Sequence, residues 1–435
     1  MAAGVGIGVV KSPVVWPAPD YDTVAASVRD LFRSLDLDAG NPLGRWIRPG
    51  MRVVIKPNWV KHESGDTVGC NVLYTHISLV RVLIEAALRA LDGSGRVDVA
   101  DAPLQGCDFQ RLRQQSGLAG LEAAYEDAPV YFHDLRLQWA DIDDASSYVR
   151  AVRSLPGDPL GYSTVDLGPR SRLMCFGVNE RFGVTDYSAG KTNGFHHGSH
   201  SYLVSNTVLG ADVILNVPKL KTHIKTGMTG ALKNFVGIIG SKDCLPHFRT
   251  GSPRNGGDEY PDRNWVSRVA SPARVFLQSR APLWAWKLAR AGARATHAPL
   301  ISGGAWHGND TLWRTVHDLV DIARNYTVGG VLRATPRPML TLVDAIVAGE
   351  DCGPLRPRPK PTGMLIWGED PGMVDVACAT LMGFAWRRIP LLAHLRDAEA
   401  RHFCELAEVA EFERLIGDFQ APPGWAGKIE LGRKE

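Results

Sequence analysis

The amino-acid sequence predicts an α/β fold, with a largely parallel sheet, helices on both faces and a helical insertion. Short apolar runs of strand length alternate with segments whose apolar residues recur at helical spacing, a pace typical of βαβ units. The chain has 435 residues, and its hydrophobic share of 45% and charged share of 22% are those of a globular protein that buries a full core.

The first third of the chain shows this alternation most clearly. Asp20 precedes a segment of helical apolar spacing as its N-cap, and Pro57 ends the second apolar run. Thr75 or Ser78 is expected to cap the second helix. The expected elements are strand 5–11, helix 21–37, strand 52–57, helix 77–90 and strand 97–100.

The later parts of the chain suggest three units. We expect residues 1–250 to form an α/β domain, residues 251–310 a basic helical insertion, and residues 311–435 a C-terminal α/β portion that completes the fold. In the last unit the pattern predicts helix 311–328 with Asp310 as its cap, strands 339–347 and 363–367, and helix 371–382.

The insertion carries a basic segment, residues 263–309, with seven lysines or arginines, four tryptophans and no carboxylate. One interpretation is a helical cover whose long basic side chains face solvent. The alternatives are a lid over an anionic ligand, or a surface that contacts a membrane or a partner.

The overall composition narrows the class of protein. A net charge of +3 argues against a general nucleic-acid binder, and no apolar run approaches the roughly 18 residues of a membrane span. The N-terminus lacks the features of a signal peptide. Seven scattered cysteines without a C-x-x-C pair favour a reducing cytoplasm over a disulfide framework or a self-contained iron–sulfur module. We therefore expect a cytoplasmic protein.

The most informative stretch is residues 211–247, where a buried strand is followed by a loop rich in lysine and glycine. Lysines and backbone N–H groups in such a turn are suited to holding phosphate or carboxylate, although the loop lacks the order of a Walker A motif. Solvated loop charges are the alternative. The candidate residues are Lys219, Lys221, His223, Lys225 and Lys233. Lys233 could also act as a covalent amine or a base.

Other polar residues follow neighbouring strands. Lys56, Asn58, Asp101 and Asp344 lie at or near strand ends, and in parallel sheets the functional loops gather at the carboxyl ends of strands. We expect these side chains to face the same cleft as the lysines, where an aspartate would orient a lysine or histidine or act as a base. For Asp101 and Asp344, capping of the following turn is the alternative.

Four histidines are candidate metal ligands. His196, His197 and His200 share one loop and His247 follows the lysines, and imidazole is a common ligand of zinc, iron or nickel. H-H-x-x-H is not a recognised ligand spacing, so hydrogen-bonding loop residues are the alternative. The cofactor is left unknown, with a divalent transition metal as the candidate.

Several of these motifs carry a family resemblance. V-V-I-K-P-N (53–58), A-D-A-P (100–103), A-D-V-I-L-N-V-P-K-L-K-T-H…G-A-L-K-N (211–234), V-D-A-I-V…G-P (343–354) and G-E-D-P…V-D-V (368–376) together resemble the bacterial family called domain of unknown function 362. The resemblance implies an α/β fold and no general reaction. Many of that family's members resemble or carry iron–sulfur partners.

A more distant similarity concerns His223 and Lys233. The segment H-I-K-T-G-M-T-G-A-L-K is similar to H-x3-G-x-[ST]-G-G-x-K of lactate-racemase-type proteins, with Ala231 in place of the second glycine. The similarity implies that Lys233 would anchor a nickel-pincer nucleotide and that His223 would be a catalytic acid or base. His247 would match a nickel-binding histidine only loosely.

These observations predict a cytoplasmic enzyme acting on a small anionic metabolite, with racemase- or isomerase-like proton or hydride transfer assisted by a metal or metal-organic cofactor. His223, Lys233 and Asp101 would be catalytic. Lys56, Asn58, Lys219, Lys221, Lys225 and Asp344 would bind substrate. The alternatives are a metal-dependent redox enzyme with a separate iron–sulfur electron carrier, and a non-enzymatic protein that binds an anion or nucleic acid.

Overall fold

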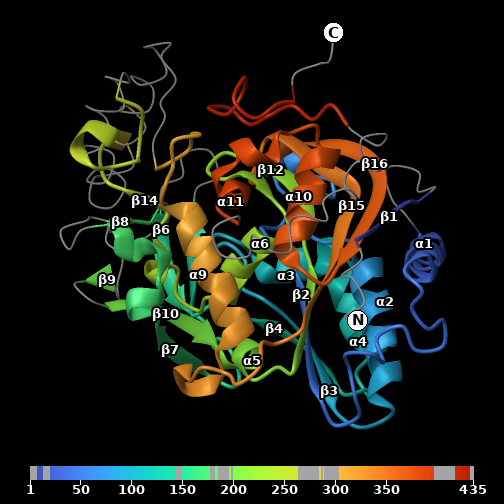
Figure 1. Ribbon diagram of the computed structural model, residues 1–435. Helices are drawn as coiled ribbons and strands as arrows, with labels where there is room; N and C mark the ends of the chain where they lie inside the picture. The colour runs from blue at the N-terminus through green and yellow to red at the C-terminus, as the bar shows by residue number, and fades with distance from the viewer. Residues whose placement is uncertain are drawn as a thin grey trace.

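The computed structural model of the chain describes residues 7–12, 20–142, 149–176, 182–184, 195–196, 199–262, 284–285, 288, 303–395 and 417–431. Its main sheet has the strand order β1-β16-β15-β11-β2-β3-β4, and β12 and β13 extend it beside β15 (Figure 1). These strands are β1 (Gly8–Lys11), β2 (Arg52–Pro57), β3 (Arg96–Asp101), β4 (Val130–Asp134), β11 (Val213–Val217), β12 (Lys219–His223), β13 (Gly227–Thr229), β15 (Met339–Cys352) and β16 (Arg356–Gly368).

The centre of the sheet is parallel. β15, β11, β2, β3 and β4 all run in the same direction, whereas β16 pairs antiparallel with β15 and β1 pairs antiparallel with β16. The prediction of an α/β fold with a largely parallel sheet is confirmed.

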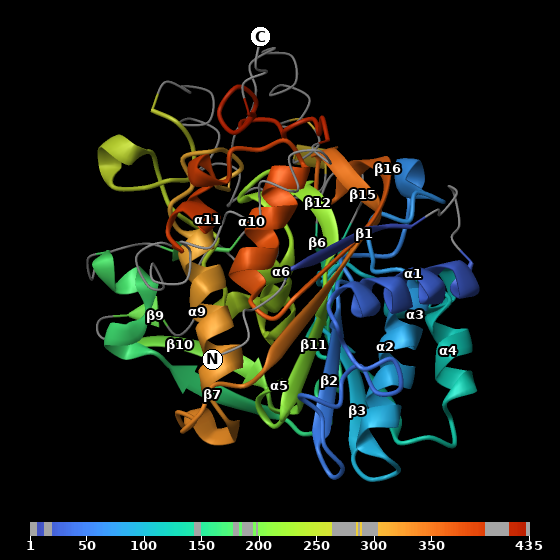
Figure 2. The same cartoon turned by 45° about the vertical axis from the view of Figure 1, so that its right-hand side comes forward.

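Both faces of the sheet are buried because its strands are apolar on both sides. Val53 and Ile55 of β2 pack in one cluster with α1 (Tyr21–Ser34) and α2 (Ile77–Leu91), and Val54 packs in another with α9 (Leu312–Asn325). Figure 2 shows the sheet between α1 and α2 on the right and α9 and α10 on the left. Helices on both faces are therefore confirmed.

Shorter elements complete the described part of the chain. The remaining helices are α3 (Phe109–Gln115), α4 (Leu118–Ala124), α5 (Asn206–Leu209), α6 (Ala231–Asn234), α10 (Pro371–Leu381) and α11 (Pro390–Ala393). Small sheets pair β5 (Gln138–Ile142) with β6 (Val149–Ser154), β10 (Ser199–Ser205) with β7 (Tyr162–Asp166) and β9 (Phe195–His196), and β14 (Phe248–Arg249) with β8 (Phe182–Gly183).

Two predicted helix caps are wrong and one is confirmed. Asp20 caps α1 by accepting from the amide of Thr23 at 2.8 Å, as expected. The cap of α2 is His76, whose Nδ1 accepts from the amide of Ser78, rather than Thr75 or Ser78. At the start of α9 the side chain of Asn309, not Asp310, accepts from the first amides.

The hairpin of β15 and β16 is longer than the predicted strands 339–347 and 363–367. Pro357, Pro359 and Pro361 recur at every second position of β16, so their missing N–H groups all fall on one edge of the strand, and the pairing with β15 continues through these positions. Prolines usually argue against a strand, which is why the apolar pattern alone stopped short here.

No helix within the described ranges combines the length and apolar composition that crossing a membrane requires. Most of the predicted helical insertion, and with it most of the basic segment 263–309, lies outside the described residues.

Candidate functional site

Two buried ion pairs join neighbouring strands, one at the carboxyl ends of β2 and β3 and one between the first residue of β12 and the interior of β15. Lys56 of β2 contacts Asp101 of β3, with Nζ and Oδ1 2.7 Å apart, and Lys219 of β12 contacts Asp344 of β15, with Nζ and Oδ2 2.9 Å apart. All four side chains are buried. Loss of solvent lowers the pKa of Lys56 and raises the pKa of Asp101. Lys56 and Lys219, both predicted to bind substrate, therefore each have a carboxylate partner within the protein.

Gly237 gives the first ion pair its space. A Cβ atom at this position would lie 1.8 Å from Oδ1 of Asp101 and 2.6 Å from Nζ of Lys56. The carbonyl oxygen of Gly237 also accepts from the amide of Ala102 at 2.8 Å, next to Asp101. One glycine of the glycine-rich run is thus required by the close approach of a buried ion pair.

Lys221 is held by a chain of side-chain amides. Its Nζ donates to Oδ1 of Asn58 at 2.5 Å, Nδ2 of Asn58 donates to Oδ1 of Asn234 at 3.1 Å, and Nδ2 of Asn234 donates to Oδ1 of Asn216 at 2.7 Å. Burial, reinforced by the charge of Lys219, places the pKa of Lys221 well below its ordinary value. The structure therefore brings Asn58 into this group as a partner of a lysine.

Beyond these pairs, His223, Lys225, Lys233 and His247 come together. His223 ends β12, Lys233 lies on α6, and His247 precedes β14. Burial and then the charges of Lys233 and Lys225 place the pKa of His223 well below its ordinary value, and His247 adds to this effect. Burial and the same two lysines also place the pKa of His247 well below its ordinary value. Both imidazoles are therefore neutral near pH 7.

The hydrogen bonds of the two rings fix opposite tautomers. Nδ1 of His223 accepts from the amide of Lys225 at 3.0 Å, so a neutral ring carries its proton on Nε2. Nδ1 of His247 lies 2.8 Å from the carbonyl oxygen of Leu245, which can only accept. A neutral His247 therefore has its lone pair on Nε2. One ring presents a donor and the other an acceptor.

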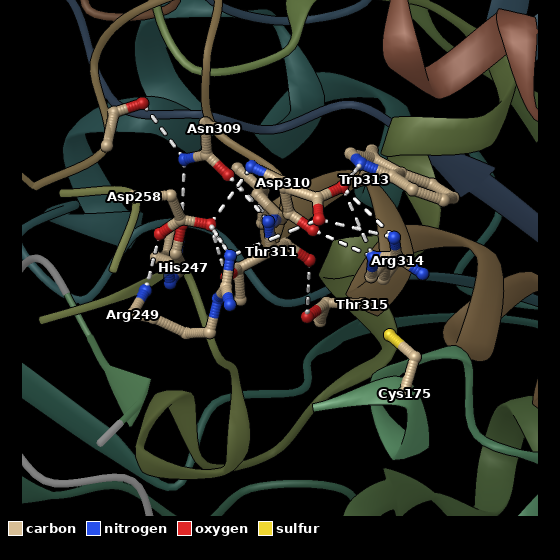
Figure 3. Close-up of polar contacts among 12 residues, drawn as sticks. Cys175, His247, Arg249, Asp258, Asn309, Asp310, Thr311, Trp313, Arg314 and Thr315 are labelled. Atoms are coloured by element: carbon tan, nitrogen blue, oxygen red, sulfur yellow. Dashed lines mark hydrogen bonds and ion pairs between the residues drawn. The ribbon is translucent and has the colours of Figure 1, made fainter. Parts of the chain in front are cut away.

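The backbone of His247 is fixed by a polar network at the start of α9 (Figure 3). Nδ2 of Asn309 donates to the carbonyl oxygen of His247 at 2.9 Å. Asp258 accepts from the amides of Arg249 and Asp310 and from the hydroxyl of Thr311, at 2.5, 2.9 and 2.6 Å. These contacts join the segment that carries His247 to α9.

Three further residues of this region were not among the predicted site residues. Lys242 is buried, its Nζ donates to the carbonyl of Ala102 at 3.0 Å, and burial lowers its pKa to about 7. Asp375 of α10 accepts from the first amides of α6, and burial raises its pKa to about 7. Thr229 lies opposite Lys221 in the β12–β13 pair, and its buried hydroxyl has no hydrogen-bond partner among the described residues. Lys242 lies two residues after Gly240, at the end of the glycine-rich run, a signal that could have identified it.

Two of the other predicted metal ligands, His196 and His200, belong to the small sheet of β7, β10 and β9. Nδ1 of His200 is 2.8 Å from Oγ of Ser171, which donates to Asp318 of α9. The backbone of His196 pairs with Ser199, and His197 lies outside the described residues. Within the part of the chain that the structure describes, no three His, Cys, Asp or Glu side chains are grouped to hold a metal ion.

Comparison with solved structures finds distant similarities. A Thermotoga maritima protein solved by the Northeast Structural Genomics Consortium aligns with 13% identity and a TM-score of 0.31, over 83% of this chain and 58% of that one. The lactate racemase apoprotein from Thermoanaerobacterium thermosaccharolyticum aligns with 11% identity and a TM-score of 0.32, over 81% of this chain and 55% of that one. The chain thus spans less than two thirds of either protein, and at these scores neither similarity informs the reaction.

The search among curated proteins gives no match. The scan against protein families gives one, which begins after the motifs at 53–58 and 100–103 and includes the lysine-rich stretch and the β15–β16 hairpin. Residues 177–380 match the family described as Domain of unknown function (DUF362), which confirms the family resemblance over this segment.

Proposed function

We propose that this chain is an enzyme that binds a small anionic metabolite at Lys225 and Lys233 and transfers a proton on it through His223 and His247. The most concrete version is a racemase- or isomerase-type reaction at the carbon next to a carboxylate. The observation that carries the proposal is the pair of neutral imidazoles with opposite tautomers beside two lysines.

The charges of the site suit such a ligand. The charges of Lys225 and Lys233 both act on the two histidines, so an anion placed among them would be attracted by two ammonium groups. Fixed cations also stabilise the negative charge that develops on a carboxylate when the neighbouring carbon loses a proton. The same cations keep the imidazoles uncharged, as a general base requires.

The tautomers indicate which ring would accept a proton and which would donate a hydrogen bond. Nε2 of His247 would take the proton from the substrate carbon, which breaks a C–H bond and forms an N–H bond. Nε2–H of His223 would donate a hydrogen bond to the negative charge that develops on the substrate carboxylate. The protonated His247 would exchange its proton with solvent and return a proton to the carbanion, which restores the neutral ring.

The residues of the two buried ion pairs, together with Lys221, would support this site rather than contact the ligand. Lys56, Asp101, Lys219 and Asp344 are paired with one another and buried, and Lys221 is held by Asn58. Their ion pairs link β2 to β3 and link β12, which ends at His223, to β15.

A resident metal does not fit the described residues, because they form no group of three metal-ligating side chains. A covalent cofactor on Lys233, as the lactate-racemase similarity implies, would use a half-buried amine beside His223. The proton transfers above are assigned to this chain's own residues, and none of them passes through a metal or cofactor.

Solvent exchange tests the proposal directly. The protein would be incubated in D2O with lactate, malate, alanine and aspartate, and loss of the α-proton signal would be followed by proton NMR. We expect deuterium incorporation into at least one of these acids, and a loss of about 100-fold or more for His223→Gln and for His247→Gln.

His307→Gln is the matched control: His307 contacts the carbonyl of Arg388 through Nε2 and packs edge-on against Trp425, and glutamine can replace the donor. Saturable binding of these acids without exchange would leave the non-enzymatic anion-binding alternative. If the protein neither bound these acids nor exchanged their protons, the site assignment would be wrong.

A further inference from the structure

A cavity of about 500 Å³ is lined in part by Leu232 of α6, the residue next to Lys233. The rest of the wall comes from α9, from the start of α10 and from the short helical turns η2 (Gly168–Arg170) and η3 (Arg172–Cys175). This volume falls within the range of small-molecule sites in proteins.

The polar wall of the cavity is rigid. Asp318 is buried, and both of its oxygens are occupied: Oδ1 accepts from the amide of Arg172 at 2.8 Å, and Oδ2 accepts from the hydroxyls of Ser171 and Tyr202 at 2.5 and 2.8 Å. His200 in turn contacts Ser171. A carboxylate anchored by three donors holds its surroundings in place and has little capacity left to bind a ligand itself.

Three arginines and three aspartates line the cavity. Arg170 pairs with Asp321 and Arg324 pairs with Asp370, each at 3.5 Å and each with an arginine more than a third exposed, so these rim contacts are weak. Arg172 also lines the cavity, and its guanidinium forms no hydrogen bond or ion pair with any described residue. Its charge acts on the carboxylate of Asp318, whose oxygens are already occupied by other donors.

The remaining wall is apolar. Leu232, Val320 and Leu395 come from three different segments and lie around the same space. A guanidinium recognises carboxylate oxygens through paired N–H donors, and apolar side chains favour the hydrocarbon part of a ligand.

We propose that this cavity is a second binding site, which takes a small organic carboxylate through Arg172 and packs its hydrocarbon part against Leu232, Val320 and Leu395. The site is separate from the proposed proton-transfer site and does not depend on it. It adjoins that site because Leu232 and Lys233 are consecutive residues of α6, whose first amides are held by Asp375.

Methyl NMR of the full chain tests this site without knowledge of the reaction. Succinate and benzoate would be titrated into protein labelled at leucine and valine methyls, with succinamide and benzamide as uncharged controls. We expect saturable shifts at Leu232, Val320 and Leu395 with a carboxylate and none with its amide. Arg172→Gln is expected to weaken binding by tenfold or more, and Lys233→Ala to leave it unchanged.

Arg172→Gln should fold normally because the guanidinium forms no hydrogen bond or ion pair with a described residue, and thermal unfolding would check this. Val320→Phe, which fills the cavity, provides a second variant that should block binding. The proposal is wrong if neither carboxylate gives saturable shifts at these methyls, or if Arg172→Gln binds as well as the wild type. Loss of binding in Lys233→Ala alone would place the carboxylate at the lysines instead and would also overturn it.

Discussion

Asn309 connects His247 to helix α9 with both ends of its side-chain amide. Nδ2 donates to the carbonyl oxygen of His247 at 2.9 Å, while Oδ1 accepts from the amides of Thr311 and Leu312 at 3.1 and 2.9 Å. Figure 3 shows this arrangement beside Asp258 and Arg249. One side chain thus caps the helix and fixes the backbone of the proposed base.

Substitution of Asn309 can separate these two roles. Asn309→Asp keeps an oxygen that caps α9 but cannot donate to His247, whereas Asn309→Ala loses both contacts. We expect Asn309→Ala to lower the free energy of unfolding by about 1–3 kcal/mol. Asn309→Asp should retain α9 by circular dichroism yet shift the ring resonances of His247.

The control is Asn325→Ala at the other end of α9, where the side chain only contacts Asp321. It should leave the His247 resonances in place. If Asn309→Asp also left them in place, Asn309 would be a helix cap and nothing more.

The tautomers of the two proposed catalytic histidines can be measured directly. Ring nitrogen NMR at pH 7 should show the proton of His247 on Nδ1 and the proton of His223 on Nε2, because each ring's partner on Nδ1 fixes it. Both pKa values should lie well below 6.5.

The same pKa shifts predict a pH dependence of stability. In the unfolded chain both histidines gain a proton as the pH falls through about 6.5, whereas in the folded protein they stay neutral. The unfolded state then binds more protons, so the free energy of unfolding should fall below pH 6.5. A variant with both histidines replaced by glutamine should lose part of this slope, and an unchanged slope would contradict the assignment.

The sequence pattern was sufficient for the general plan of the fold and the place of the site. Apolar runs and helical spacing indicate a parallel sheet, and the carboxyl ends of its strands point to Lys56, Asp101, Lys219 and Asp344. The sequence does not show that these four residues form two ion pairs. The pairing depends on the register between β2 and β3 and between β12 and β15.

Other features depend on contacts between distant segments. Asn309 rather than Asp310 caps α9 because Asn309 is also held by His247 and Gly304, and the chain around it is set by those contacts. In the sequence Lys242 looks no different from the predicted lysines. Only the folded chain shows that its amine is buried and donates to the carbonyl of Ala102.

Gly237 allows a test of the buried ion pair. A methyl group at this position would collide with Asp101 and Lys56, so Gly237→Ala should separate or displace the pair. We expect a loss of about 3–5 kcal/mol in the free energy of unfolding, the cost of disrupting a buried pair. Urea denaturation would measure it.

Gly120→Ala is the matched control, because Gly120 lies within α4 and a Cβ atom there would meet no atom within 4 Å. Alanine should stabilise this helix by about 0.5–1 kcal/mol. A Gly237→Ala variant as stable as the wild type would mean that the ion pair tolerates displacement.

Lys242 should make stability depend on pH in the alkaline range. Burial lowers its pKa in the folded protein to about 7, whereas an unfolded lysine stays protonated up to about pH 10.4. Between these values the unfolded state binds more protons, so the free energy of unfolding should rise with pH, by up to about 1.4 kcal/mol per unit. Urea denaturation of the wild type and Lys242→Met at pH 7, 8, 9 and 10 would isolate this contribution, since the variant lacks the titrating amine. The difference between the two proteins should change steadily in favour of the wild type as the pH increases, and a constant difference would show that Lys242 keeps an ordinary pKa in the folded state.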